Sequence, residues 1–375
     1  MATKTASKQD QREASVDVVV VGAGVIGLAC AWRCAERGLR VKVIERGRPG
    51  AGASNVAAGM LAPVGEASWG EDRLLEMALA SHHLWPGFAA DLARASDADV
   101  GYVRLGALHV ALDRDEAAEL RRRYELMQSH GLVAEWLTPR ACRELEPGLR
   151  GAGGGVHAAH EAAVDPKALI AALVTALERA GGTIEIAEVN GAVIEDQRLR
   201  GVVTAEGSEH RGSAVVVAAG SWSGAEWLPL EARPRVRPVK GQILTLAGPA
   251  DAPVCERIVV TERVYIVPRA DGRLVVGATV EEQGFDERVT AGGVHELLRE
   301  AYRVLPEIAE LELVEAVAGL RPATPDNLPL IGSGAIAGLT LATGHFRNGM
   351  LLAPLTAQRI AESLVGDRGA VEVAA

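Results

Sequence analysis

The sequence contains little of what several classes of protein depend on. It has four cysteines in 375 residues, and none of them stands at a spacing that suits a metal site. Cys30 and Cys34 lie one helical turn apart, where packing accounts for them better than a disulfide does. Neither G-x-S-x-G nor H-E-x-x-H occurs, so no serine nucleophile or zinc protease motif is present. We therefore expect no bound metal, reduced thiols and a cytoplasmic location.

The sequence also has no long basic run and no segment typical of a membrane span. The formal net charge is −10, so nucleic acid is not an expected partner. Residues 1–14 are polar and have no apolar centre, which predicts a disordered tail rather than a signal peptide. The apolar stretch from Val16 to Cys34 contains three glycines and changes from a strand pattern to a helix pattern. We expect no membrane span there.

The strongest positive signal is a strand, turn and helix pattern that begins at Val16. The β-branched run Val18–Val21 predicts a buried strand, and Gly22, Gly24 and Gly27 follow it with G-x-G-x-x-G spacing. The first glycine permits a tight turn, the second a close approach to a pyrophosphate, and the third close packing of helix on strand. The helix N-terminus would offer free N–H groups to the phosphates. This pattern predicts a dinucleotide site.

An acidic residue and a loop of small residues follow this pattern. Glu45 ends the next predicted strand, where it is placed to accept hydrogen bonds from an adenosine ribose. An acid at this position disfavours a 2′-phosphate, so FAD or NAD is favoured over NADP. Residues 46–63 are rich in Gly, Ala and Ser, and we expect them to lie against the cofactor. The expected contacts of this loop are Ser54, Asn55, Ala58, Gly59 and Met60.

Further along, helical and strand patterns alternate. Leu74–Ala95 predicts a helix that Pro86 interrupts, and Tyr102–Leu112 predicts a half-buried antiparallel strand. Asp115–His130 predicts an amphipathic helix whose arginines 121–123 belong to a solvated surface.

Apolar strands typical of a parallel sheet occur at the start, in the middle and near the end of the chain. Ala214–Ala219, which ends at Gly220, resembles a central parallel strand, whereas Val236–Val280 predicts an antiparallel meander. With 48% hydrophobic residues, the chain can build two cores. We expect two interleaved domains, a cofactor domain of residues 15–62, 160–230 and 318–375, and a substrate domain of residues 63–159 and 231–317.

Several motifs together indicate a family. They span nearly the whole chain after the tail and include VVVGAGVIGLACAW, VDPKALIAAL, VVVAAGSWSG, PVKGQILTL, YIVPRADGRLVVGATVEEQGFD, AGLRPATPDNLPLIG and LATGHFRNGMLLAP. The pairs YIVPR with GATVEE and GLRP with GHFRNG are the most specific of them. On these motifs the chain resembles the glycine oxidases of the thiamine-biosynthesis type, within the D-amino-acid oxidase family of FAD-dependent enzymes.

The resemblance implies an α/β fold in which a Rossmann-like FAD-binding domain is interleaved with an antiparallel-sheet substrate domain, the D-amino-acid oxidase-like α+β arrangement. It implies FAD as cofactor and a homo-oligomer, with a tetramer as one candidate. The expected cofactor contacts are Gly22, Gly24, Val25, Ile26, Gly27, Glu45, Arg46, Ser54, Asn55, Ala58, Gly59, Met60, Val189, Ala219, Gly220, Trp222, Gly344, His345, Phe346, Arg347, Asn348, Gly349 and Met350.

The expected chemistry needs a group that binds a carboxylate. A planar guanidinium suits this task, and the resemblance places Arg321 at the family's carboxylate-binding position. It also implies that Tyr265 contacts the substrate, and Arg347 is a further candidate, while His345 is as readily positional as catalytic. The N-terminus of the last predicted helix, at about Asn348, would stabilise negative charge on the reduced flavin ring.

The resemblance implies oxidative deamination of a small amine by hydride transfer to flavin N5. O₂ would reoxidise the flavin to give H₂O₂, and glycine would give glyoxylate and ammonia, with sarcosine, D-alanine and D-proline as further substrates. Val280 stands where the family often has methionine, and Arg263 stands at a variable position, so the order of preference stays open. Two alternatives also stay open: a dehydrogenase with another electron acceptor, and a flavin-carrying module that serves a partner.

Overall fold

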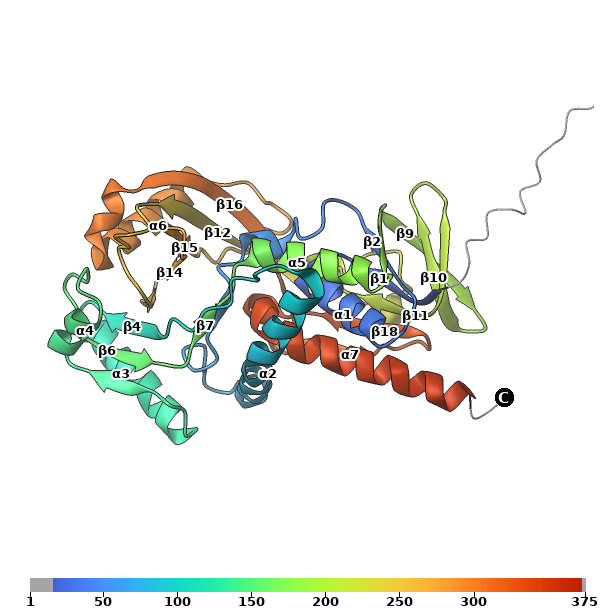
Figure 1. Cartoon of the computed structure of the whole chain (residues 1–375), viewed down its shortest axis with the longest axis horizontal. Helices are drawn as coiled ribbons and strands as arrows, with labels where there is room; N and C mark the ends of the chain where they lie inside the picture. The colour runs from blue at the N-terminus through green and yellow to red at the C-terminus, as the bar shows by residue number, and fades with distance from the viewer. Residues whose placement is uncertain (1–15, 373–375) are drawn as a thin grey trace, which may run out of the picture.

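The computed structural model describes residues 16–372, and side chains as far as residue 366. The predicted tail at residues 1–14 lies outside the described residues. Two large sheets form the two ends of the molecule, and helices lie around and between them (Figure 1). A two-stranded ribbon of β3 (Met60–Leu61) and β7 (Ala162–Ala163) lies between the two sheets. No helix in residues 16–372 is both long and apolar enough to span a membrane.

The first sheet is built around strand β1, which the sequence predicted as buried. Val18, Val19 and Val20 are at most 1% exposed, because both faces of the strand are covered. The strand order is β17-β18-β11-β1-β2-β8, parallel throughout except for the edge strand β17, and the hairpin β9–β10 extends from β11. The bounds are β1 Val16–Val21, β2 Val41–Glu45, β8 Thr183–Ile186, β9 Val189–Glu195, β10 Arg198–Thr204, β11 Glu209–Val217, β17 Leu330–Ser333 and β18 Leu339–Thr343.

In the described residues, four helices form a layer on one side of this sheet. They share one core with β1 and are α1 Val25–Glu36, α2 Asp72–Ser96, α5 Pro166–Arg179 and α7 Gly349–Glu372. Helix α2 packs on the other three. Helix α5 begins as predicted, because the Asp165 carboxylate accepts hydrogen bonds from the N–H groups of Lys167 and Ala168 at 2.8 and 3.1 Å. The four cysteines are free and buried, and burial raises the pKa of the Cys34 thiol to about 12.

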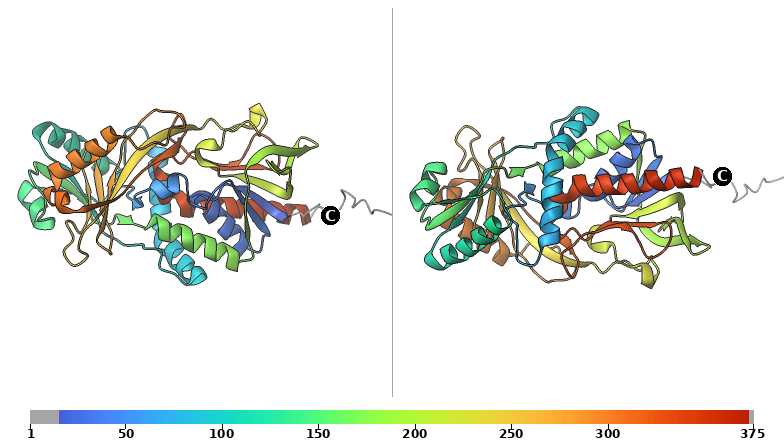
Figure 2. Two further views of the ribbon diagram at one scale, coloured as in Figure 1. Left: turned by 90° about the horizontal axis from the view of Figure 1, so that it is seen from above. Right: turned by 90° about the horizontal axis from the view of Figure 1, so that it is seen from below.

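The predicted interruption at Pro86 is wrong, because α2 continues through it as one helix of 25 residues. Proline removes one helical hydrogen bond, and tertiary packing offsets that loss. Trp85 is fully buried and its Nε1 donates to the carbonyl of Leu351 at 2.9 Å, while the Ser81 hydroxyl donates to the same carbonyl at 2.6 Å. These bonds attach α2 to the beginning of α7, which it crosses (Figure 2, right).

The second sheet has the order β16-β12-β15-β14-β13-β4-β6-β5. The predicted meander is confirmed, since β12, β15, β14 and β13 pair antiparallel in turn. The bounds are β4 Ala107–Ala111, β5 Glu135–Leu137, β6 Gly154–Ala158, β12 Arg237–Ala247, β13 Ile258–Val260, β14 Tyr265–Pro268, β15 Arg273–Gly277 and β16 Glu312–Ala323. Helices α3 Arg114–Ser129, α4 Pro139–Leu145 and α6 Ala291–Val304 pack against this half, which lies at the left of Figure 1.

The strand predicted at Tyr102–Leu112 differs from the expectation in three respects. Only Ala107–Ala111 forms a strand, all five residues are buried, and the strand is parallel to β13 while it is antiparallel to β6. The prediction of a half-buried strand was wrong because apolar clusters cover both faces. Leu108 and Val110 belong to one cluster, and Ala111 belongs to another. Within residues 16–372, 3₁₀ turns also occur at Ala53–Val56, Gly220–Trp222, Leu230–Ala232, Pro306–Glu310 and Phe346–Asn348.

The arrangement of the two halves confirms the expected fold class, because segments far apart in sequence build each sheet. The interleaved domain boundaries stay a proposal. Helix α2 falls in the segment expected for the substrate domain, but it packs against α1, α5 and α7 of the other half. We therefore propose that residues 72–96 accompany the cofactor domain.

Candidate functional site

One large cavity lies between the two halves of the molecule. Its volume is about 930 Å³, and its wall contains the β1–α1 turn, the loop after β2, the start of α7 and the inner face of the second sheet. Among the described residues, no cluster of three or more His, Cys, Asp or Glu side chains is arranged to hold a metal ion.

The glycines of the β1–α1 turn bring the N-terminus of α1 to this cavity. Gly22 has a φ of 103°, and a Cβ there would lie 2.5 Å from the carbonyl oxygen of Ala218. A Cβ on Gly27 would overlap the carbonyl oxygen of Gly22. Gly24 is extended and lines the cavity, and the N–H of Val25 donates to the Ser54 hydroxyl at 2.9 Å. The turn therefore presents close backbone and a helix N-terminus, as phosphate binding requires.

Glu45 ends β2 on the same wall of the cavity. Its carboxylate accepts hydrogen bonds from the N–H of Ala23 at 2.7 Å and from the N–H of Gly47 at 3.0 Å. A carboxylate has about four acceptor sites. Two of them hold the turn in place, and the others remain for hydroxyl donors such as those of a ribose.

The structure brings together most of the residues expected to contact the cofactor. All of them line the cavity except three, which are Gly27, Asn55 and Gly344. Gly27 serves the packing of α1 on the turn. Gly344 has a φ of 77°, and a Cβ there would lie 2.5 Å from the Thr324 methyl group, so its role is likewise in the backbone. The cradle of glycines, the helix N-terminus and the acid together fit FAD.

The inner face of the second sheet carries Arg321 and Tyr265 at the other part of the cavity. Both side chains lie over glycines, because a Cβ on Gly241 would overlap the Arg321 guanidinium and a Cβ on Gly277 would overlap the Tyr265 ring and hydroxyl. Nη1 of Arg321 donates to the carbonyl oxygens of Thr279 at 3.1 Å and of Lys240 at 3.4 Å. No carboxylate in the described part of the chain forms an ion pair with Arg321, which leaves its charge for a ligand.

The Tyr265 hydroxyl remains protonated in this setting. Burial raises its pKa, and the nearby charge of Arg321 opposes that effect only in part. The Glu66 carboxylate also raises the pKa, so these three groups lie within electrostatic range of one another.

Arg347 differs from Arg321 in its partners. Its Nε lies 2.6 Å from Glu66 Oε2, and its Nη2 lies 3.9 Å from Glu71 Oε2. The side chain lines the cavity, but its charge is already balanced. The expected role of Arg347 in substrate contact therefore stays a prediction.

Glu66 and two further residues of the cavity wall were not among the predicted site residues. Arg123 was expected on a solvated surface, which is wrong, because it lines the cavity and donates to the carbonyl of Gly65. Its position indicates this placement, because Arg123 follows buried Leu120 by three residues and so lies on the same face of α3. His109 of β4 also lines the cavity and is 3% exposed, and no motif marked it.

His345 lies at the cavity before α7 and is 2% exposed. Its Nε2 is 2.9 Å from the Thr356 hydroxyl on α7, and burial lowers its pKa to about 3. The imidazole is therefore neutral near neutral pH. This favours a positional role for His345 over a catalytic one. The next residue, Phe346, has a φ of 48°, a strained value for a bulky side chain.

His345 gives a testable pH dependence of stability. Its folded-state pKa of about 3 lies below the ordinary 6.5, so the unfolded chain binds a proton that the folded chain excludes. The stability contribution is complete above pH 6.5 and is lost as the pH falls toward 3, with a slope of about 1.4 kcal/mol per pH unit. Urea unfolding of the His345→Gln variant should show a smaller slope than the parent, and equal slopes would contradict the assignment.

The two glycines of the turn should respond differently to alanine. Gly27→Ala should destabilise the fold by about 1–3 kcal/mol, because the methyl group overlaps backbone. Gly24→Ala should keep the fold, since the new methyl group meets only the Ser54 hydroxyl, at 3.4 Å, but it should weaken flavin binding about tenfold. Thermal unfolding and the flavin-to-protein ratio measure the two effects. Equal flavin loss in both variants, with equal stability, would contradict this division.

Comparisons with known proteins identify the family of the chain. The family described as FAD dependent oxidoreductase, DAO, matches residues 17–363. The glycine oxidase of Geobacillus kaustophilus is 36% identical over 351 residues, which cover 92% of each chain, and its crystal structure matches with a TM-score of 0.88 at 35% identity, covering 94% of this chain and 95% of that one.

Two further relatives widen the comparison. The bifunctional protein ThiO/ThiG of Trichormus variabilis is 37% identical over 358 residues, which are 93% of this chain and 52% of that protein. The crystal structure of iminodiacetate oxidase from Chelativorans sp. BNC1 matches with a TM-score of 0.85 at 28% identity, covering 93% of this chain and 95% of that one. The chain belongs to the DAO family of FAD-dependent oxidoreductases, together with the glycine oxidases.

Proposed function

We propose that the protein oxidatively deaminates glycine and other small amines, including sarcosine, D-alanine and D-proline. The proposal rests on Arg321 and Tyr265, which both lie on the cavity wall formed by the second sheet. In the described residues, Arg321 forms no ion pair with a carboxylate. A guanidinium in this state suits the carboxylate of an amino acid.

Arg321 would hold the substrate carboxylate in a defined place. A guanidinium has five N–H donors, and Nη1 already donates to two main-chain carbonyls. These bonds fix the plane of the group, so the remaining donors can form two parallel bonds to a carboxylate without further ordering. FAD, when bound, supplies the redox chemistry by accepting a hydride from the substrate Cα and passing two electrons to O₂, which becomes H₂O₂.

Tyr265 would act at the polar end of the substrate. Its protonated hydroxyl can donate to a carboxylate or accept from an amine, and it stands beside Arg321 on this cavity wall. Glycine at positions 241 and 277 brings the two side chains close to the backbone, which leaves the space above them for ligand.

The start of α7 would hold the flavin at its pyrimidine end. Residues 345–351 line the cavity there, and the helix begins at Gly349. The first N–H groups of a helix have no partner within it, and they favour negative charge beside them. The N–H of Asn348 is already bonded to the carbonyl of His345 at 2.9 Å, so Arg347, Gly349 and Met350 are the proposed donors.

We propose glyoxylate, ammonia and H₂O₂ as products from glycine, and a role in thiamine biosynthesis. The similarity to the bifunctional protein ThiO/ThiG supports the second point. The expectations of a cytoplasmic location and of a homo-oligomer remain parts of this proposal, and the four free, buried cysteines are compatible with the first of them.

Amines with a second acidic group are an additional candidate substrate class. Arg123 and Arg263 both line the cavity, and neither forms an ion pair with a carboxylate in the described residues. Such cations favour a ligand with more than one carboxylate. Iminodiacetate, the substrate named for one structural relative, has this form.

A panel of amines tests the proposal. Purified protein should be yellow, and it should consume O₂ and form H₂O₂ with glycine or a related small amine. Turnover only with an artificial electron acceptor would indicate a dehydrogenase. A flavin-loaded protein that turns over no amine with either acceptor would leave the flavin-carrying module as the better interpretation.

Removal of the guanidinium should weaken substrate binding. Arg321→Ala should raise KM for glycine at least about tenfold, because a charged hydrogen bond contributes about 1.5–3 kcal/mol. The matched control is Arg140→Ala on α4, whose side chain is 85% exposed and forms an ion pair with Glu144. Steady-state O₂ uptake measures KM for both variants. An Arg321 variant with parental KM would exclude Arg321 as the substrate clamp, that is, as the group that binds the substrate carboxylate.

A further inference from the structure

Strand β12 presents different chemistry on its two faces. Val239 and Gly241 face the cavity side with Arg321, which pairs with Val239 in the register of β12 and β16. Lys240, the residue between them, points to the opposite side and is 1% exposed. It is not part of the cavity wall. A fully buried lysine directly behind the clamp requires an explanation, because burial of an ammonium group is costly unless it is paired.

The main chain of Lys240 contacts Arg321 and the segment after β15. Its carbonyl oxygen accepts from Nη1 of Arg321 at 3.4 Å and from the N–H of Glu281 at 3.0 Å. Its own N–H donates to the carbonyl of Glu281 at 2.9 Å. The second carbonyl that holds Arg321, that of Thr279, lies two residues before Glu281. The two carbonyls that accept from Arg321 therefore both lie where Lys240 of β12 meets residues 279–281, a contact that we call the junction.

Side chains behind the sheet hold the junction together. Nζ of Lys240 lies 3.5 Å from Glu281 Oε2 and 3.9 Å from Asp286 Oδ2. Oε1 of Glu281 accepts from the Thr279 hydroxyl at 2.6 Å and from Nε2 of Gln242 at 2.7 Å. The Thr279 hydroxyl in turn accepts from the N–H of Gln242 at 2.9 Å. The network thus joins Lys240 to the residue that provides the second carbonyl.

Charge keeps this network in one arrangement. Burial raises the pKa of Glu281, but hydrogen bonds from Thr279 and Gln242 and the charge of Lys240 outweigh it and hold the pKa below its usual value. Loss of the ammonium group would leave the Glu281 carboxylate inside the network without its cation. The Glu281 side chain is 24% exposed, so without the buried cation the segment of residues 279–281 would shift to bring the carboxylate further into water.

We propose that Lys240 is a positioning residue for the substrate clamp: through Glu281 and Thr279 it fixes the two carbonyls that orient the Arg321 guanidinium. The inference rests on the proposed role of Arg321 in binding the substrate carboxylate. Lys240 itself touches neither substrate nor flavin. Its effect should therefore appear in carboxylate binding and not in flavin binding.

The test uses the flavin-loaded Lys240→Met variant, which keeps the length of the side chain and removes its charge. KM for glycine should rise about tenfold, and kcat should stay within about twofold. Glycolate, a carboxylate without an amine, is the binding probe, and its Kd from the flavin absorption change should rise by the same factor. A fall in kcat at unchanged KM and unchanged glycolate affinity would overturn the proposal.

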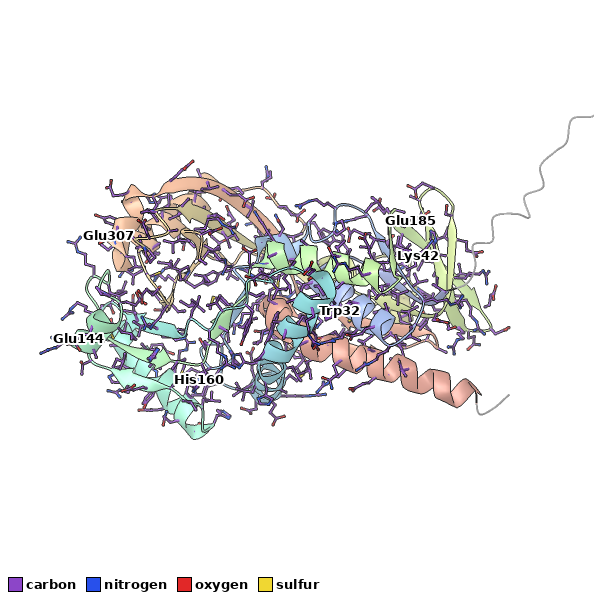
Figure 3. The ribbon with its side chains drawn as sticks, in the orientation of Figure 1. Trp32, Lys42, Glu144, His160, Glu185 and Glu307 are labelled. Atoms are coloured by element: carbon purple, nitrogen blue, oxygen red, sulfur yellow. The ribbon has the colours of Figure 1, made fainter. Side chains whose placement is uncertain are left out.

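Lys42→Met is the matched control. Its Nζ lies 3.2 Å from Glu185 Oε2 between neighbouring strands of the first sheet, at the end of the molecule away from the second sheet (Figure 3). This variant should keep the parental KM and glycolate affinity. An equal loss of glycolate affinity in both variants would show a general effect of removing a lysine ion pair, and the positioning role would be excluded.

A double-mutant cycle shows whether Lys240 acts through Arg321. In the Arg321→Ala background, Lys240→Met should raise KM no further, whereas a full additional rise would place its action elsewhere. Glu281→Gln should also raise KM. It replaces Lys240→Met as the test variant if Lys240→Met yields no flavin-loaded protein. An Arg321→Ala variant with parental KM refutes the clamp itself. A strong Arg321 effect with no effect of Lys240→Met or Glu281→Gln refutes only the positioning role.

Discussion

The close contact between the β1–α1 turn and helix α1 is the constraint on which the cofactor half depends. Gly27 lies so near the carbonyl of Gly22 that no side chain fits between them, and Gly22 lies close to the carbonyl of Ala218, the residue after β11. Two strands and one helix therefore meet through backbone alone. This contact places the N-terminus of α1 on the cavity wall and lets Glu45 hold the turn from the end of β2.

Backbone contact also organises the opposite half. Gly241 and Gly319 face each other across β12 and β16, and the Arg321 guanidinium lies over the first of them. Val56 lies over Gly319 and belongs to the loop that follows β2 in the other half. The same row of small residues thus makes room for the clamp and lets the two halves pack together. Substrate and cofactor sites share one cavity because of this packing.

The arginines of the cavity show how partners decide what a charge can do. Arg347 has two carboxylates within 4 Å, so its charge is balanced by the protein. Arg321 has main-chain carbonyls instead, which orient the guanidinium and leave its charge uncompensated. Residue type alone does not separate these two cases, and neither does position in a motif. The difference arises from where Glu66 and Glu71 are brought by the loop before α2.

The buried parallel strands, the glycine turn and the capped helix at Asp165 could be predicted from the sequence, because each depends on the local periodicity or conformational freedom of a few neighbouring residues. The family motifs could be recognised in the same way. Other features depend on tertiary contacts. Helix α2 continues through Pro86 because Trp85 and Ser81 bond to a distant helix, and β4 is buried on both faces because separate clusters cover it. Arg123 entered the cavity, and Lys240 came to lie behind Arg321, through contacts between segments remote in sequence, which no local pattern contains.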